Sequence, residues 1–133
     1  MTQMVFINIP VSDVARSRVF YQALGFTINE QFSDETAACV VVSDTIFIMI
    51  LGHAKFDSFI TQPRADTAQT TTALFALNRD DRAAVDAMTT AAIAAGGTEP
   101  KPATDHGFMY TRTFMDPDGN TFEPFWMDPA AIG

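Results

Sequence analysis

The pattern of apolar and polar positions divides this chain into two similar series of elements. In the first series, runs rich in β-branched and aromatic residues predict strands over residues 5–11, 26–29, 37–42 and 45–51. In the second, the same criterion predicts strands over 71–77, 107–114 and 121–127, with at most a short edge strand at 98–100 because of the prolines at 100 and 102. Each series therefore begins with one strand and ends with several. Between them lies a stretch in which the apolar positions recur with a different spacing.

That stretch is a helix in both halves. Val14, Ser17, Tyr21 and Leu24 share one helical stripe, Ser12 or Asp13 precedes it as an N-cap, and Gly25 follows it. In the second half the stripe contains four residues of similar spacing: Val85, Met88, Ala92 and Ala95. Asn78 or Asp80 is the expected cap, and Gly96-Gly97 ends the helix.

The order strand, helix, three strands thus occurs twice, which predicts an internal repeat within one domain spanning 1–133. We place the first module at 4–51, a linker at 52–69 and the second module at 70–128. The alternative is an α+β sandwich whose two halves share element order by coincidence.

A hairpin closes the second module. Asp116-Pro117-Asp118-Gly119-Asn120 consists of turn-forming residues, and either Asp118 or Gly119 supplies the positive φ. The strand that follows contains one carboxylate, Glu123, among apolar side chains. Glu123 therefore lies either on the solvent side of a sheet or in a chemical role.

Composition narrows the classes of function. A net charge of -8 excludes an electrostatic surface for nucleic acid or an anionic membrane. Cys39 is the only cysteine, so neither an internal disulfide nor a cysteine-based metal knuckle can form. The N-terminal residues have no basic stretch followed by an apolar one, and we expect a cytoplasmic protein without a signal peptide.

Three phrases in order resemble one family. The residues Ile9-Pro10-Val11-Ser12-Asp13 with Phe20-Tyr21-Gln22-Ala23-Leu24-Gly25-Phe26, then Ala95-Gly96-Gly97, then Asp116 to Asn120 with Glu123, resemble the glyoxalase/bleomycin resistance/extradiol dioxygenase (vicinal oxygen chelate) superfamily. The nearest likeness is to small bacterial proteins named predicted lactoylglutathione lyases. The resemblance implies an α+β fold of two βαβββ modules, forming a curved eight-stranded mixed sheet around a cleft, and a homodimer.

The resemblance also implies positions for a metal site. Metal-dependent members hold the ion with one residue on the first and one on the last strand of each module. These positions correspond here to Phe6, Met49, Thr72 and Glu123, of which only Glu123 is a good ligand. We therefore expect no metal; the alternative is a divalent ion (Ni, Zn or Fe) at a relocated site using Glu123 with His106, which is otherwise peripheral.

Strand alternation groups the residues of each strand by face. The resemblance implies which of these faces line the cleft, and it places Thr111 and Thr113 among them. The lining residues form an apolar surface with a few polar points: Phe6, Asn8, Phe47, Met49, Thr72, Thr111, Thr113, Glu123 and Phe125. Glu123 is the candidate catalytic residue, as a base or as an acceptor for a cationic ligand. The alternative is that Glu123 has no chemical role, is a remnant of the metal site of the family, and forms a hydrogen bond with Asn8 or a threonine.

Three hypotheses of function follow. The first is a small-molecule-binding protein with a degenerate metal site, which an apolar cleft tipped with a carboxylate favours. The second is a metal-dependent lyase or isomerase of the lactoylglutathione lyase type. The third is a metal-independent enzyme with Glu123 as its base, so whether the protein is an enzyme stays open.

Overall fold

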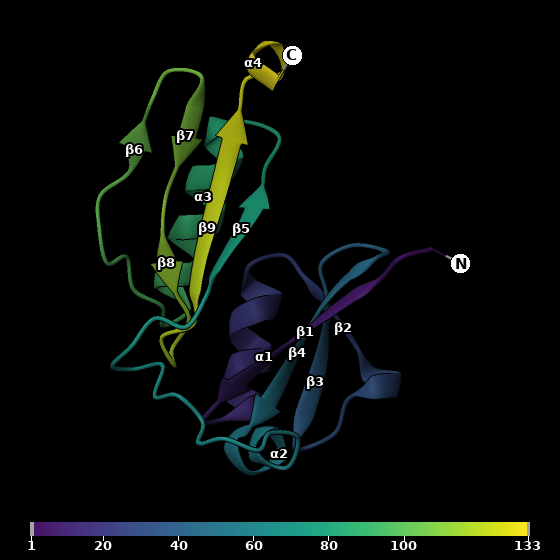
Figure 1. Cartoon of the computed structure of the whole chain (residues 1–133). Helices are drawn as coiled ribbons and strands as arrows, with labels where there is room; N and C mark the ends of the chain where they lie inside the picture. Colours follow the sequence, from purple (N-terminus) through teal and green to yellow (C-terminus); the bar gives the residue numbers. More distant parts are fainter. Residues whose placement is uncertain (1, 133) are drawn as a thin grey trace. The chain divides into compact units, whose positions relative to one another are not determined.

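The computed structural model describes residues 2–132, and the chain forms two compact units that meet at Asp66 and Thr67 (Figure 1). The elements of the first unit are β1 Val5–Val11, α1 Val14–Ala23, β2 Thr27–Asn29, the 3-10 turn η1 Glu30–Phe32, β3 Ala37–Val41, β4 Ile46–Gly52 and α2 His53–Asp57. Those of the second are β5 Leu74–Asn78, α3 Arg82–Ala94, β6 Thr104–Asp105, β7 Met109–Thr111, β8 Phe114–Met115, β9 Thr121–Met127 and α4 Pro129–Ile132.

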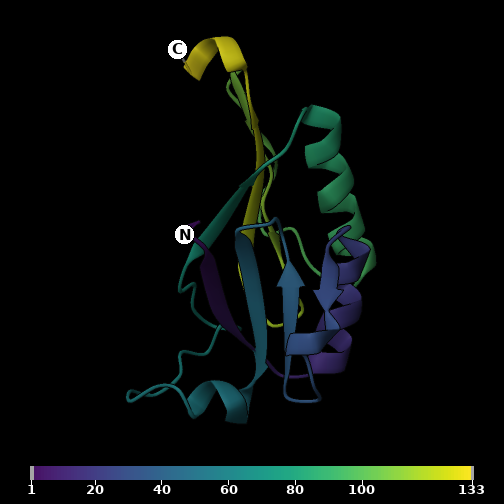
Figure 2. The same ribbon diagram turned by 90° about the vertical axis from the view of Figure 1, so that its right-hand side faces the viewer.

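The first unit is a four-stranded mixed sheet with α1 on one face. Its strand order is β1-β4-β3-β2, in which β1 and β4 are parallel and the other pairs are antiparallel. Ile9, Val11, Ile48 and Ile50 are buried on the face that α1 covers, and Phe20 and Tyr21 of the helix are fully buried. Figure 2 shows α2 at the end of β4, followed by an irregular segment.

The predicted ends of α1 are confirmed. The Asp13 carboxylate accepts a hydrogen bond from the backbone N–H of Arg16 at 3.0 Å, which satisfies one of the free donors of the first turn. Gly25 follows the C-cap with a φ of 98°, a conformation that costs glycine little.

The second unit repeats this plan with α3 packed on β9, β8 and β7. Its strand order is β5-β9-β7-β6, with β8 also paired to β9, and β5 runs parallel to β9. The face toward α3 includes Phe114 and Phe122, whose rings stack at 5.4 Å between centroids.

The strand expected over 107–114 is divided into β7 and β8, and the cause lies opposite the break. Pairing has the same register on both sides, with Thr111 opposite Phe125 and Phe114 opposite Phe122. Pro124 stands between, and the Arg112 backbone N–H donates to its carbonyl at 3.1 Å. Proline has no N–H to return that bond, so the ladder is interrupted without a change of register.

Two further expectations in the second unit need correction, and a third is met. The cap of α3 is Asp81, which accepts from the Ala84 N–H at 2.7 Å, and not Asn78 or Asp80. Strand β5 begins at Leu74, so Thr72 precedes it. At 98–100, where at most a short edge strand was expected, one bridge joins Thr98 to Met115, and the edge strand of the sheet is β6.

The turn before β9 is organised by Asp116, which is 2% exposed. Its carboxylate accepts hydrogen bonds from the backbone N–H groups of Asp118 and Asn120 and from the Asn120 side chain, at 2.8–2.9 Å. Gly119 has a φ of 90° and therefore supplies the positive φ that the turn requires.

The α+β class and the two modules of mixed β-structure are confirmed, with one difference. The strands among residues 2–132 form two mixed sheets, one in each unit, and no closed barrel. In the same range, no helix has the length and apolar character needed to cross a membrane.

Candidate functional site

The sheet of the first unit presents one face away from α1, and the residues predicted for that part of the site lie on it. Phe6 pairs with Phe47 and Asn8 with Met49 between parallel strands, so these four side chains point to the same face. The rings of Phe6 and Phe47 stack at 4.7 Å, and Phe6 keeps 49% of its surface exposed. The structure therefore brings the four together.

A cavity of about 500 Å³ opens beside this face. Leu51, which alternates with Phe47 and Met49 along β4, and Asn8 form its sheet side, while α2 and the residues after it supply Phe56, Phe59 and Ile60. Its lining is apolar except for Asn8. This size and chemistry suit a small, mostly apolar molecule that makes one directed hydrogen bond.

Asn8 retains hydrogen-bonding capacity at the cavity. Its side-chain amide donates to the Phe6 carbonyl at 3.2 Å, which fixes how the amide lies. The Asn8 side-chain oxygen has no hydrogen-bond donor among the described residues. It remains available to a bound molecule.

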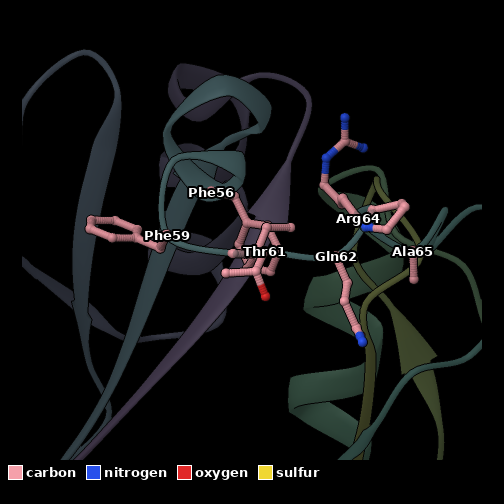
Figure 3. A pocket seen from close by; sticks show the side chains of 8 residues that line it. Phe56, Phe59, Thr61, Gln62, Arg64 and Ala65 are labelled. Atoms are coloured by element: carbon pink, nitrogen blue, oxygen red, sulfur yellow. The ribbon is translucent and has the colours of Figure 1, made fainter.

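A second cavity of about 390 Å³ adjoins the first and shares Phe56, Phe59 and Ile60 with it (Figure 3). Its other walls come from the irregular segment 61–65 alone, with Arg64 held by an ion pair to Asp57 at 2.9 Å. Because no sheet residue supports it, we regard this hollow as an extension of the first cavity.

In the second unit the predicted residues gather on the face of the sheet opposite α3. Ala76 and Asn78 of β5 lie beside Glu123 and Phe125 of β9 in the parallel register, and Thr111 faces Phe125 from β7. The register places Thr113 opposite Glu123. Thr72 is exposed and lies outside β5, so it does not share this face as a strand residue.

Glu123 is half-buried, and within its own unit it forms no hydrogen bond or ion pair with a described residue. The expectation that a threonine of this unit holds it as a remnant is therefore not met. His106 lies in the loop between β6 and β7, exposed, with its ring 6.1 Å from that of Phe108. This position agrees with a peripheral histidine.

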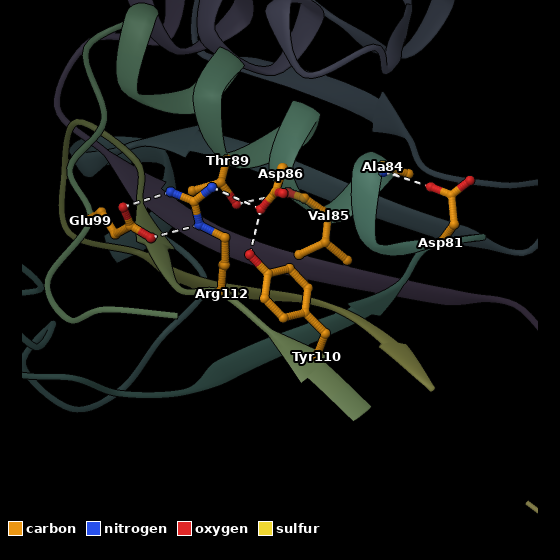
Figure 4. A network of polar contacts seen from close by, with 8 residues as sticks. All are labelled: Asp81, Ala84, Val85, Asp86, Thr89, Glu99, Tyr110 and Arg112. Atoms are coloured by element: carbon orange, nitrogen blue, oxygen red, sulfur yellow. Dashed lines mark hydrogen bonds and ion pairs between the residues drawn. The ribbon is translucent and has the colours of Figure 1, made fainter. Parts of the chain in front are cut away.

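The opposite face of the sheet carries a polar network that has a structural role (Figure 4). The Arg112 guanidinium donates two hydrogen bonds to Glu99, both at 2.8 Å, and one to Asp86 at 3.0 Å. The Tyr110 hydroxyl donates to the same Asp86 at 2.6 Å. This network ties α3 to β7 and to the chain before β6, as expected for side chains that point toward the helix.

The network also lowers the pKa values of its two carboxyl groups, those of Glu99 and Asp86. Hydrogen bonds from Arg112 lower the pKa of Glu99, and those from Tyr110 and then Arg112 lower the pKa of Asp86. Trp126 joins the same face, with the Arg82 guanidinium 5.0 Å from its ring centroid. Cys39 is 1% exposed, and burial raises the pKa of its thiol, as expected for an inert cysteine.

The side chains at the four ligand positions do not fit a divalent metal. Phe6 has no donor atom and is stacked on Phe47, and Met49 offers only a thioether. Among residues 2–132 no three His, Cys, Asp or Glu side chains come together as a ligand set.

The sequence prediction missed the α2 side of the cavity. Leu51 shares a face with Phe47 and Met49 by alternation, and Phe56, Phe59 and Ile60 carry the signal of a short helix, which the structure forms over His53–Asp57. Phe56, Phe59 and Ile60 lie in the segment 52–69, which was predicted as a linker. Nothing in their spacing indicates that they lie over the face of β1 and β4.

Comparisons with known proteins agree with this architecture. Residues 3–43 match the family model of the bleomycin resistance protein-like N-terminal domain. No curated protein sequence matches the chain.

Solved structures share the whole fold. The hypothetical protein SA1046 of S. aureus is 23% identical with a TM-score of 0.80, covering 95% of this chain and 94% of its own. A glyoxalase/bleomycin resistance protein/dioxygenase family enzyme of Burkholderia phytofirmans PsJN is 22% identical, with a TM-score of 0.77 and coverage of 95% and 99%. A bleomycin resistance determinant encoded on transposon Tn5 is 19% identical, with a TM-score of 0.65 and coverage of 96% and 99%.

These similarities confirm the predicted resemblance to the glyoxalase/bleomycin resistance/dioxygenase superfamily at the level of fold. The nearer likeness to lactoylglutathione lyases stays a prediction, because fold alone does not supply an activity.

Proposed function

We propose that this protein binds a small, largely apolar organic molecule without a divalent metal centre. The observation that carries the proposal is the cavity of about 500 Å³ at the first unit, with four apolar side chains and Asn8 as its only polar one. A flat or aromatic body would lie between Phe56, Phe59 and the sheet, and Asn8 would fix its orientation. The fold that this chain shares with bleomycin resistance proteins also supports small-molecule binding.

The remaining predicted site residues belong to this proposal as the wider binding surface. In the first unit Phe6, Phe47 and Met49 extend the surface beside the cavity, and in the second unit Thr111, Thr113, Glu123 and Phe125 form a separate candidate surface. We also propose that the protein forms a homodimer. Strand β1 is an edge strand of the first sheet and exposes Val5 and Phe6, and such an edge can pair with a second chain.

A thermal-shift screen of small aromatic compounds tests the proposal. A compound present at a hundred times its Kd stabilises the folded state by about 2.7 kcal/mol, a clear rise in melting temperature. Phe59→Ala removes one wall of the cavity and should weaken binding about tenfold, the effect of losing one aromatic contact.

Phe32→Ala is the matched control. Phe59 and Phe32 are both exposed phenylalanines of the first unit, at 66% and 64%, and only Phe59 lines the cavity. Truncating either should change stability little, and the Phe32 variant should keep its affinity. Equal losses in both variants, or no stabilising compound at all, would contradict the proposal.

One observation favours a second candidate, a metal-independent enzyme. Glu123 is half-buried and has no partner in its own unit, which would leave its carboxylate free to take a proton from a bound molecule. In that case a compound from the screen would be chemically changed after incubation with the protein and unchanged after incubation with Glu123→Gln.

A further inference from the structure

The wall that faces the sheet across the cavity of the first unit is held in place by α2 and the turn that follows it. The backbone N–H of Phe59 donates to the carbonyl of Phe56 at 3.0 Å, and that of Ile60 donates to the carbonyl of Asp57 at 3.4 Å. The Lys55 ammonium lies 5.3 Å from the centroid of the Phe59 ring and attracts it. Hydrogen bonds of the turn and a cation therefore position the apolar side of the cavity.

Asn8 is the polar point on the sheet side, and the two ends of its amide differ. The side-chain nitrogen donates to the Phe6 carbonyl at 3.2 Å. Because a carbonyl oxygen can only accept, this contact selects the nitrogen of the amide and turns the Asn8 oxygen away from Phe6. No described residue donates to that oxygen, so both of its lone pairs are free, whereas one of the two N–H groups is already used.

The rest of the lining gives Asn8 control over which polar group of a ligand is accommodated. The other four side chains are apolar and cannot form a hydrogen bond: Leu51, Phe56, Phe59 and Ile60. A polar group of the ligand that loses its water in this cavity must therefore pair with Asn8 or stay unpaired, which is costly. A ligand donor meets a fully free acceptor, and a ligand acceptor meets only the one remaining N–H.

We propose that Asn8 selects flat aromatic molecules with an N–H or O–H donor at the edge of the ring, such as indoles and phenols, and accepts that hydrogen bond with its side-chain oxygen. This inference rests on the proposed function and narrows it from apolar molecules in general to those that carry a donor. The aromatic body would contact Phe56 and Phe59 while the donor points to the sheet.

Three bicyclic probes of nearly equal shape test the proposal. Indole has one N–H donor, benzofuran has only a weakly accepting ring oxygen, and benzoxazole has an accepting ring nitrogen and no donor. NMR titration of the ¹⁵N-labelled full chain gives each Kd. Indole should bind about three- to tenfold more tightly than either of the others, the range of a hydrogen bond between neutral groups. It should also shift the side-chain amide signals of Asn8.

Three variants assign the effect to the Asn8 oxygen. Asn8→Leu has a side chain of similar size without an acceptor, so indole should lose its advantage and bind like benzofuran. Asn8→Asp keeps an acceptor oxygen at the same position and should keep the preference for indole. Gln22→Leu is the matched control, because it replaces an exposed amide of α1 outside the cavity and should change no affinity.

The outcomes separate this inference from the function on which it rests. If the three probes bind equally and Asn8→Leu changes none of them, the donor preference is wrong and small-molecule binding stands. If benzoxazole binds most tightly, the remaining N–H of Asn8 is the recognising group and the inference is overturned. If none of the probes binds, the inference fails, and the thermal-shift screen decides separately on the proposed function.

Discussion

Gly119 has no room for a side chain. Its φ is 90°, and a Cβ atom there would overlap the backbone carbonyl oxygen of Thr67. Thr67 is held in place because its hydroxyl donates to the Asp118 carbonyl. The turn therefore packs directly against the backbone at the start of the second unit, and Gly119 is the point of closest approach.

We predict that Gly119→Ala lowers the free energy of unfolding by more than about 2 kcal/mol, because both the left-handed backbone and the overlap oppose it. Urea unfolding followed by circular dichroism measures the change.

Gly107→Ala is the comparison. Gly107 has a similar φ of 81°, but a Cβ there would meet nothing within 4 Å. Only the backbone strain applies, so the expected loss is about 1 kcal/mol. Losses of equal size would show that the contact with Thr67 contributes nothing.

At the scale of single residues the sequence was informative wherever local geometry decides. Asp13 as a cap and Gly25 at a helix end follow from neighbours in the chain, and both are confirmed. The choice between Asp118 and Gly119 required the structure. The hydrogen bond from Thr67 to Asp118 joins residues 51 positions apart, and no local pattern encodes it.

Arg112 connects elements, and its removal should be felt mainly at neutral pH. Its side chain is 19% exposed and binds Glu99 and Asp86, whose exposures are 22% and 49%. We predict that Arg112→Met costs about 2 kcal/mol at pH 7, the range of hydrogen bonds to charged groups.

The pH dependence follows from the lowered pKa values of Glu99 and Asp86. A carboxyl with a lowered folded-state pKa adds stability above its ordinary pKa, and that stability is lost as pH falls through the folded-state value. Denaturant unfolding of both proteins from pH 7 to pH 3 should therefore show the difference narrowing below about pH 4.5.

Arg18→Met provides the comparison for this prediction. Arg18 pairs with Glu30, which is 67% exposed, so the loss at pH 7 should be at most about 0.5 kcal/mol. A loss in Arg112→Met that does not depend on pH would show that packing, and not charge, is responsible.

At the scale of elements the two repeated series were predictable because periodicity reports which side of an element is buried. The limits of β7, β8 and β5 were not, because partners decide them. Pro124 interrupts a strand that has a good apolar pattern of its own, and Thr72 falls outside β5 although its neighbours are strand-like. The order of pairing between strands is a property of the whole sheet.

Across the whole molecule, the described residues contain no group of three side chains suited to a metal ion. We therefore predict that the purified protein contains no stoichiometric Ni, Zn or Fe and that titration with Ni²⁺, Zn²⁺ and Fe²⁺ gives no stoichiometric binding. Elemental analysis and calorimetry provide these measurements.

Metal binding would contradict this prediction, and a Glu123 variant would show where the ion binds. Stoichiometric binding that disappears in Glu123→Ala would favour the metal-dependent lyase alternative over the proposed function. Binding that persists in that variant would place the ion elsewhere. Asp80→Asn, which removes one exposed carboxylate, is the charge control.

At this scale the sequence predicted the residues that share a sheet face, apart from Thr72, because alternation along a strand is a local rule. It did not predict the cavity, since Phe56, Phe59 and Ile60 reach the first sheet through packing of α2 on β1 and β4. It also gave no means to see that the Thr113 hydroxyl is unpaired.

The position of β9 in the chain has a consequence for synthesis. Among the strands of the described residues it is synthesised after all the others, yet β5, β7 and β8 all pair with it. The first sheet is complete once β4 has emerged, so the first unit can fold while translation continues. A nascent chain that ends at Asp116 would thus carry one finished sheet and a second in which β5, β7 and β8 lack their common partner strand until β9 is made.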